Sequence, residues 1–407
     1  MRRIGALSIA CASALALAWV QAAPLPAAPG AAVSSPDPQS RSCLTCHASA
    51  AGALTGPMAT RADERAFAHR AFGPVEGERF FEQSCSGCHV SACSDCHGAA
   101  THPEAPPMGP ATGSSRRWHP IGRPRDEACL RCHRGDSVGA AYHGRAPRED
   151  HPRYQRGPQD EAGEHYLKML PDVHQERGMT CADCHRMGTH GHDAKTSTRG
   201  CRDCHPAPDP KVPEHAIGAH LEKMRCSACH AAWATQEYAT VLVRPRTEAQ
   251  QEAFAVLPQI GEWRRSASHR RQDAPPLGLD GAGLVAPIRP KHQLFATDPS
   301  RGWENRLLAA EWVPFEPHTV RAGTVACGGC HDQPRRFVLE ADADRILRPD
   351  LDGLALRSFW NREGQAVRGG AFLPGPRHAA MNRKTPVYLR ETLRQWQRLL
   401  AAQRSAR

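Results

Sequence analysis

The sequence predicts a mainly α-helical fold with extensive irregular loops, on the basis of three observations. Only 6% of the 407 residues are aromatic. The 34 glycines and 35 prolines make up about 17% of the chain, against a usual 12% or so. Eight copies of the pattern Cys-x-x-Cys-His use 16 of the 17 cysteines. Such a chain makes a poor conventional core, so we expect little β-sheet, short helices at the motifs and loops between them.

The repeated pattern predicts haem attachment. Chance predicts about 0.04 copies in a chain of this composition. Structural zinc sites and disulfide frameworks have no need for a histidine directly after every second cysteine. Cysteines at i and i+3 project from one helical turn and can form thioethers with two vinyl groups of a porphyrin, and the next residue brings an imidazole to the iron. We therefore expect eight covalently attached haem c groups, which would supply the missing apolar mass as a core of eight packed haems.

The motifs assign a role to each of their residues. The cysteines predicted to carry haem are Cys43, Cys46, Cys85, Cys88, Cys93, Cys96, Cys129, Cys132, Cys181, Cys184, Cys201, Cys204, Cys226, Cys229, Cys327 and Cys330. The histidines predicted to bind iron from the proximal side are His47, His89, His97, His133, His185, His205, His230 and His331.

Fifteen further histidines lie outside the motifs, and eight would saturate every distal iron position. The sharpest candidates come from an internal repeat, in which His174-Gln-Glu-Arg-Gly-Met-Thr-Cys181 resembles His220-Leu-Glu-Lys-Met-Arg-Cys226. Each tether is too short to reach round its own haem, so a neighbouring haem is the expected target; repeat duplication alone would also preserve the pattern. The other candidate distal ligands are His119, His318, His69, His102, His143 and His190.

Two motifs lie almost in contact along the chain. Only three residues separate His89 from Cys93. If the segment were one helix, the backbones of Cys85 and Cys93 would be about 12 Å apart. Two porphyrins tethered so closely are expected to touch, which favours electron tunnelling, although close stacking also packs a core.

The N-terminus predicts export to the periplasm. Arg2 and Arg3 precede the apolar run Ile4–Val20, and small residues follow, as in a signal peptide cleaved after Ala22 or Ala23. An uncleaved membrane anchor is the alternative. The predicted organisation is a signal peptide (1–23), a linker (24–40), a seven-haem region (41–231), a tryptophan-containing haem-free subdomain without motifs (232–326), the eighth motif (327–331) and a haem-free C-terminal region with a terminal helix (332–407).

Charge and local pattern add three expectations. The formal charge is +10, but sixteen propionates and eight ferric cores would bring it to about +2, so we expect no nucleic-acid partner. Arginine supplies 46 of the 52 basic residues, and many of these arginines are expected to bind propionates, although the base composition of the genome would give the same bias. Asp280-Gly281 predicts a hairpin turn. Thr385-Pro386 predicts a helix start, with Leu389, Leu393, Trp396 and Leu400 on one face that either packs in the core or docks on a membrane or partner.

Eight attachment motifs in one exported chain resemble the octahaem c-type cytochromes, which include tetrathionate reductase-like, hydroxylamine oxidoreductase-like and octahaem nitrite reductase-like proteins. The resemblance covers residues 43–331 and implies haems in contact, mostly with two histidine ligands. The chain lacks the Cys-x-x-Cys-Lys motif of the nitrite reductases, and none of its five tyrosines matches the haem cross-link of the hydroxylamine oxidoreductases. Lys168 is the nearest candidate for the distal lysine of the tetrathionate reductase-like proteins.

Two functions follow from the resemblance and stay open. The first is electron transfer between a membrane quinol-linked partner, such as a cytochrome b or a quinol oxidase, and a periplasmic acceptor. The second is an oxidoreductase that acts on a small sulfur or nitrogen oxyanion such as tetrathionate, nitrite or hydroxylamine. Neither the substrate, a catalytic residue nor the oligomeric state is predicted.

Overall fold

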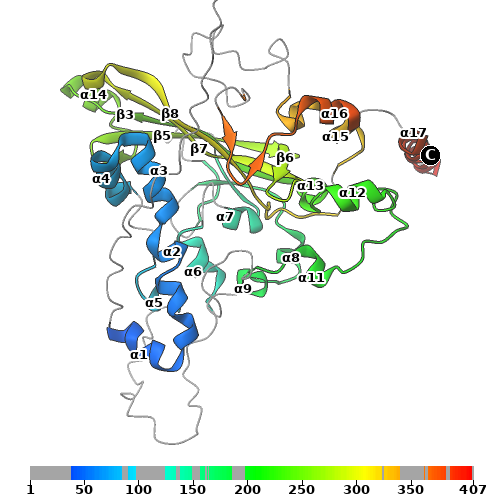
Figure 1. The fold of residues 1–407 in the computed structure, drawn as a ribbon, viewed down its shortest axis with the longest axis horizontal. Coiled ribbons are helices and arrows are strands. Elements are labelled where there is room, and N and C mark those ends of the chain that lie inside the picture. Colours follow the sequence, from blue (N-terminus) through cyan, green and yellow to red (C-terminus); the bar gives the residue numbers. More distant parts are fainter. Residues whose placement is uncertain are drawn as a thin grey trace, which may run out of the picture. The chain divides into compact units, whose positions relative to one another are not determined.

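A mixed eight-stranded β-sheet occupies the middle of the chain in this computed structural model (Figure 1). The predicted mainly α fold is therefore wrong, as is the expectation of little β-sheet. The structure describes residues 38–84, 90–97, 124–133, 138–148, 156–160, 163, 165–185, 198–322, 325–339, 362, 365–381 and 386–405.

Six strands of the sheet come from the tryptophan-containing segment without motifs, and the C-terminal region adds two short ones. In chain order they are β3 (Trp233–Val243), β4 (Gln259–Ile260), β5 (Trp263–Asp273), β6 (Leu277–Asp280), β7 (Val285–Asp298), β8 (Trp303–Pro314), β9 (Ala366–Val367) and β10 (Gly370–Ala371). The order across the sheet is β10-β6-β7-β3-β5-β4, with β8 paired to β7 and β9. The β3–β7 and β8–β9 pairs are parallel and the others antiparallel. The turn predicted at Asp280-Gly281 is present and joins β6 to β7.

The sheet has a core of protein side chains. Trp312 and Ile288 are fully buried together with Val338 and Val367. Each buried apolar side chain of this size stabilises the fold by about 1.5–3 kcal/mol. The expectation that eight packed haems form the core is therefore wrong for this part of the chain, because the few aromatic residues are concentrated where the strands meet.

Helices surround the sheet and carry the motifs. Six of them have only four or five residues and coincide with motifs: α5 (Ser94–His97), α6 (Asp126–Leu130), α9 (Cys181–Cys184), α11 (Cys201–Cys204), α13 (Ser227–His230) and α15 (Gly328–His331). The others are α1 (Pro38–Cys46), η1 (Ala48–Leu54), α2 (Pro57–Thr60), α3 (Ala62–Phe72), α4 (Pro74–Ser84), α7 (Val138–Tyr142), α8 (Val173–Glu176), α12 (Gly218–Lys223), α14 (Glu248–Ala253), η3 (Pro299–Arg301), η4 (Pro334–Phe337), α16 (Gly375–Met381) and α17 (Pro386–Ser405). A separate two-stranded sheet pairs β1 (Arg145–Pro147) with β2 (Tyr166–Lys168), where Lys168 is exposed.

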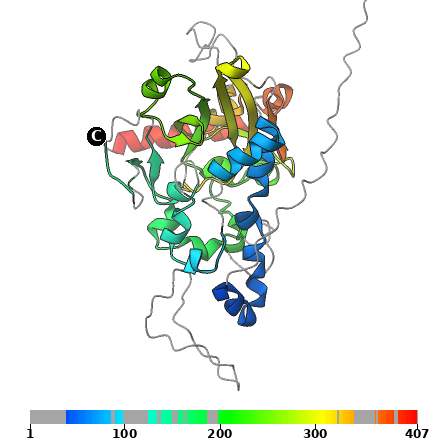
Figure 2. The same ribbon diagram turned by 90° about the vertical axis from the view of Figure 1, so that its left-hand side faces the viewer.

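The α3–α4 pair packs on the sheet through Phe72. The Phe72 ring lies 5.7 Å from that of Trp263, in a cluster that includes Leu242 and Leu294. Gly77 lets the two helices approach closely, since a Cβ there would lie 2.5 Å from the carbonyl oxygen of Ala68. The α3–α4 pair is thereby fixed to one end of the sheet (Figure 2).

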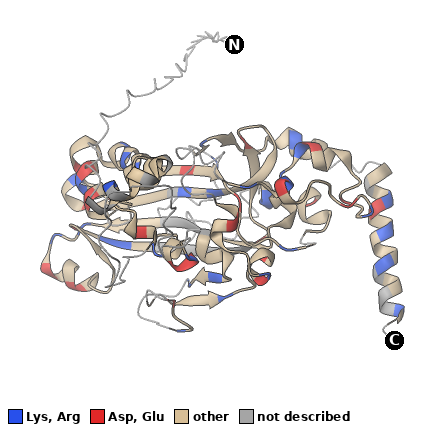
Figure 3. Cartoon of the chain, turned by 90° about the horizontal axis from the view of Figure 1, so that it is seen from below, with Lys and Arg blue, Asp and Glu red and all other residues tan. Residues whose placement is uncertain are grey.

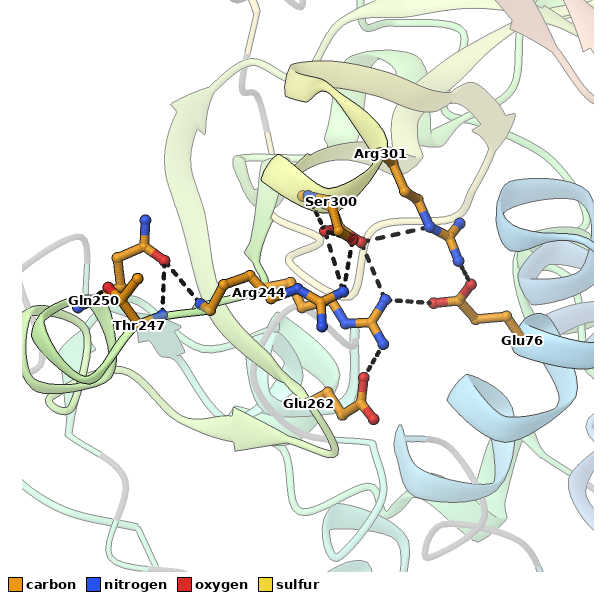
Figure 4. A network of polar contacts seen from close by, with 9 residues as sticks. Glu76, Arg244, Thr247, Gln250, Glu262, Ser300 and Arg301 are labelled. Atoms are coloured by element: carbon orange, nitrogen blue, oxygen red, sulfur yellow. Dashed lines mark hydrogen bonds and ion pairs between the residues drawn. The ribbon is translucent and has the colours of Figure 1, made fainter.

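A buried carboxylate reinforces this junction. Asp298, at the end of β7, has a fully buried side chain that lies 3.1 Å from Arg244 Nη1 and 3.4 Å from both Arg246 Nη2 and Arg301 Nε. Arg244 and Arg301 also pair with Glu76 of α4, as Figure 4 shows. These three arginines pair with the chain's own carboxylates.

The opposite part of the sheet is joined to two motifs. Leu277 of β6 and Val285 of β7 pack with Ala228 of one motif and Cys330 of another. The backbone amide of Arg225 donates to the carbonyl of Val285 at 2.9 Å. The rigid sheet thus fixes the positions of the motifs at 226–230 and 327–331.

The C-terminal helix α17 begins at Pro386, as predicted. Among the helices of the described ranges, none is long and apolar enough to cross a membrane. The predicted signal peptide and linker lie outside the described residues, apart from the last three linker positions.

Candidate functional site

Each of the seven motifs in the described ranges folds as one helical turn. The backbone amide of every motif histidine donates to the carbonyl of its first cysteine, at 2.8–3.1 Å. This i to i−4 bond brings the two cysteines to one side and places the histidine at the end of the turn. The geometry is the one that the predicted thioether attachment requires.

An aspartate before the second cysteine closes three of these turns. Asp95 accepts from the amides of Ser91 and Ala92 at 2.8 and 2.9 Å. Asp183 and Asp203 accept from the amides of Thr180 and Gly200, each at 2.8 Å. A carboxylate that satisfies the free amides of a helix start stabilises even a single turn.

Neighbouring motifs lie side by side in chain order. The Cys93 amide donates to Ser40 of α1 at 3.0 Å, and the Cys181 amide donates to Asp126 of α6 at 2.9 Å. Further along, burial raises the pKa of one cysteine, and a cysteine of the next motif lies close enough to raise it more, in the pairs Cys96–Cys129, Cys184–Cys204 and Cys229–Cys330. The seven motifs therefore form a continuous row.

Two steps of the row bring thiols into hydrogen-bond contact. The bond from Cys181 lowers the pKa of Cys129, and the bond from Cys201 lowers the pKa of Cys226. The pKa values of Cys181 and Cys201 are raised by the same contacts. In each case the first cysteines of two successive motifs meet.

Four pairs of histidine rings in the described part of the chain share one separation. The ring centroids of His174 and His205 are 6.1 Å apart, and those of His185 and His318 are 5.9 Å apart. The corresponding distance is 6.0 Å for His215 and His230, and 6.2 Å for His220 and His331. Every pair joins one motif histidine to one histidine from outside the motifs.

This separation suits two imidazoles on one metal ion. An imidazole nitrogen binds a metal at about 2 Å, and about 1.1 Å more separates that nitrogen from the ring centre, so two rings on opposite sides lie about 6.2 Å apart. The described residues therefore fit a six-coordinate iron with two histidine ligands.

Hydrogen bonds at Nδ1 orient six of the eight paired rings. His174 bonds to Asp172 Oδ1 at 2.8 Å, and His185 to Thr198 Oγ1 at 3.2 Å. Backbone carbonyls accept in the other four: Asp209 for His215, Arg321 for His230, Glu316 for His318 and Met381 for His331, at 2.7–3.2 Å. Metal-binding histidines commonly hold the second ring nitrogen in this way, which directs Nε2 to the metal.

Burial keeps several of these rings in the neutral form that binds metals. It lowers the pKa of His318 to about 4, with a further contribution from nearby His185. Burial also lowers the pKa values of His133, His185 and His220. Neutral imidazole is the ligand species.

The histidines of the internal repeat behave alike. His174 lies against the histidine of the motif at 201–205, and His220 against that of the motif at 327–331. Each one passes over the motif next to it in sequence and faces the following motif. His318 faces the motif at 181–185.

His215 is a paired residue that the sequence analysis did not select. It has no counterpart in the repeat, and its position against His230 depends on the loop between α11 and α12. No local signal marks it among the histidines outside the motifs.

Other predicted ligands lie in different surroundings. His69 Nε2 is 2.8 Å from Glu78 Oε2, between α3 and α4. His143 Nε2 is 3.2 Å from Asp126 Oδ2, and ligand atoms of these two residues and of Cys181 lie within 4.8 Å of one another. Predicted site residues outside the described ranges are Cys85, Cys88, His89, His102, His119 and His190, and the side chain of Cys46 is not described either.

Comparison of the chain with protein-family models, curated proteins and solved structures gives no match. The motifs and the geometry of the histidine pairs are therefore the features that bear on function.

Proposed function

We propose that this chain is an exported octahaem c-type cytochrome that passes electrons between a membrane quinol-linked partner and a periplasmic acceptor. The observation that carries the proposal is the set of four histidine pairs at 5.9–6.2 Å, each combining a motif histidine with one from elsewhere in the chain. Eight Cys-x-x-Cys-His motifs supply the attachment residues.

The residues have separate roles in this proposal. The two cysteines of each motif would hold a porphyrin by thioethers, and the motif histidine would bind its iron. The second ligands would be His318 for the motif at 181–185, His174 for 201–205, His215 for 226–230 and His220 for 327–331. Haem supplies reversible one-electron chemistry at iron.

The row of motifs supports electron transfer. Because successive motifs interact from residue 40 to residue 330, groups attached to them would be close neighbours. At the four paired positions two histidines would occupy both axial sites of the iron. That arrangement favours electron transfer over the alternative of an oxyanion substrate bound at those irons.

Mass spectrometry of the protein matured in a periplasm with haem-attachment machinery tests the proposal. We expect eight haem additions on a chain that lacks residues 1–22 or 1–23. Zinc bound in place of covalent haem would overturn it, and so would seven or fewer additions on fully matured protein.

Electron paramagnetic resonance separates the two functions. Low-spin haems that do not respond to nitrite, hydroxylamine or tetrathionate support electron transfer. A high-spin signal that one of these compounds perturbs would favour the oxidoreductase.

A further inference from the structure

The C-terminal helix α17 exposes an apolar stripe. Leu389, Leu393, Trp396 and Leu400 recur at spacings of four, three and four, which places them on one face of the helix. Their side chains are 46–62% exposed. The described residues do not bury this stripe, which favours the second of the two explanations that the sequence left open, docking on a membrane or partner.

A different face of α17 holds the helix on the protein. Gln395 Nε2 lies 2.6 Å from Glu214 Oε1 and 3.7 Å from Cys327 Sγ. Glu391 and Thr392 are half-buried on the same side. The helix is thus attached to the last motif, and the apolar stripe points away from that contact.

Arg390 and Arg404 lie nearest to the stripe, whereas Arg394 and Arg398 lie toward the face of Glu391 and Gln395. The helix carries Arg390, Arg394, Arg398 and Arg404 but only one acidic residue, Glu391, a net charge of +3 (Figure 3). Glu391 is itself paired with Arg394 at 2.7 Å. The twenty residues of α17 extend over about 30 Å.

We propose that α17 lies on an anionic lipid bilayer, with the leucine and tryptophan stripe in the boundary between headgroups and acyl chains. Helices that lie in this interface combine leucine and tryptophan on one face with arginine on another, and tryptophan favours the depth of the headgroups. Anionic headgroups complement the arginines. A second copy of the chain is disfavoured, because it would bring two helices of charge +3 together.

The contact between Gln395 and Cys327 gives this docking a consequence. It would bring the motif at 327–331 close to the membrane, where a quinol-linked partner resides. The docking of α17 does not depend on haem ligation. Its test can therefore fail while the proposed electron transfer holds, and electron transfer can fail while α17 still binds lipid.

Co-sedimentation of the full mature chain with vesicles tests the inference, with the bound protein measured on gels. We expect binding to phosphatidylcholine vesicles that contain a quarter phosphatidylglycerol, weak binding to phosphatidylcholine alone, and release by 0.5 M salt. Leu393→Glu combined with Trp396→Glu should weaken binding at least tenfold, because two apolar side chains no longer insert. Arg390→Glu combined with Arg404→Glu should weaken it about tenfold or more and reduce the effect of salt.

The control is Val75→Glu combined with Leu170→Glu, which adds the same two charges at exposed apolar positions outside α17 and should bind like the wild type. Circular dichroism of each variant checks that the fold is intact. Equal binding by the wild type and the Leu393→Glu, Trp396→Glu variant would overturn the inference. A dimer in sedimentation equilibrium that this variant dissociates would also overturn it, because the stripe would then be covered by a second copy.

Discussion

The imidazole rings of His220 and His331 lie 6.2 Å apart, although the whole six-strand segment of the sheet separates them in the chain. Met224, four residues after His220, bridges to Val285 of β7, and Cys330, next to His331, packs on the same strand. The sheet therefore brings the two histidines together. The short segment between His220 and the motif at 226–230 directs His220 away from that motif and toward the motif at 327–331.

Replacement of His220 by alanine should change one haem only. We expect one low-spin signal to be lost from the electron paramagnetic resonance spectrum while the others remain, because the other three histidine pairs do not involve this residue. His220→Met should keep a six-coordinate iron and raise its reduction potential, since methionine ligation raises the potential of c-type haem. Redox titration of the holo-protein measures the shift.

His165→Ala is the matched control, because the His165 ring bonds to Gln159 and to the backbone of Gly157, outside the four pairs. Its spectrum should equal that of the wild type. If His220→Ala leaves the low-spin count intact, the contact between His220 and His331 is packing and the ligand assignment fails.

His215 and His69 test whether the separation of two imidazole rings indicates a haem ligand. The sequence selected His69 as a distal ligand and passed over His215, whereas the structure places His215 against His230 and His69 against Glu78. We expect His215→Ala to remove one low-spin signal and His69→Ala to remove none. The opposite result would show that the ring separation of 6.0 Å does not indicate shared ligation.

These residues show what short-range sequence patterns can predict. The turn at Asp280-Gly281 and the start of α17 at Pro386 both depend on a few adjacent residues, and both are present. The sheet was missed because composition was averaged over the whole chain. Buried Trp233, Trp263 and Trp312 fall within one segment, where they and the apolar residues of β3 and β7 suffice for a core. The pairing of His215 with His230 was inaccessible for another reason: it depends on how a loop folds back, which no local pattern records.

The carboxylate of Asp172 should tune one haem without binding it. Asp172 is buried and accepts hydrogen bonds from His174 Nδ1 at 2.8 Å and from the Val320 amide at 2.6 Å. A carboxylate in this place makes the imidazole a stronger donor to metal. Asp172→Asn should therefore raise the reduction potential of the haem that His174 binds, with an unchanged number of low-spin haems in the resonance spectrum.

Asp209→Asn provides the control for this change. His215 bonds to the backbone carbonyl of Asp209, not to its side chain. The asparagine side chain should therefore leave the reduction potential of every haem unchanged. Equal potentials in the Asp172→Asn variant and the wild type would contradict a positioning role for Asp172.

The buried Asp298 should dominate the stability of the junction between the sheet and α4. Its side chain is fully buried beside Arg244, Arg246 and Arg301, so Asp298→Asn would remove one charged partner from all three, while Glu76 still pairs with Arg244 and Arg301. We expect the free energy of unfolding at pH 7, measured by circular dichroism in denaturant, to fall by about 1.5–3 kcal/mol, because hydrogen bonds to charged groups are weakened. Asp63→Asn is the control, because Asp63 pairs with Arg368 and Lys291 at a site where its side chain is 62% exposed, and it should cost about 1 kcal/mol or less.

The pH dependence provides a second test of Asp298. Burial alone would raise the pKa of this carboxyl, but hydrogen bonds from Ser300 and Arg244 outweigh it and lower the pKa below the usual value. A group with a lowered folded-state pKa contributes stability that is fully present above its unfolded pKa of about 3.9 and is lost as the pH falls through the folded pKa. The stability difference between wild type and Asp298→Asn should therefore stay constant from pH 7 to about pH 5 and shrink below about pH 4. A difference that grows as the pH falls would mean that the folded-state pKa of Asp298 is raised instead of lowered, and that its ion pairs do not hold the junction.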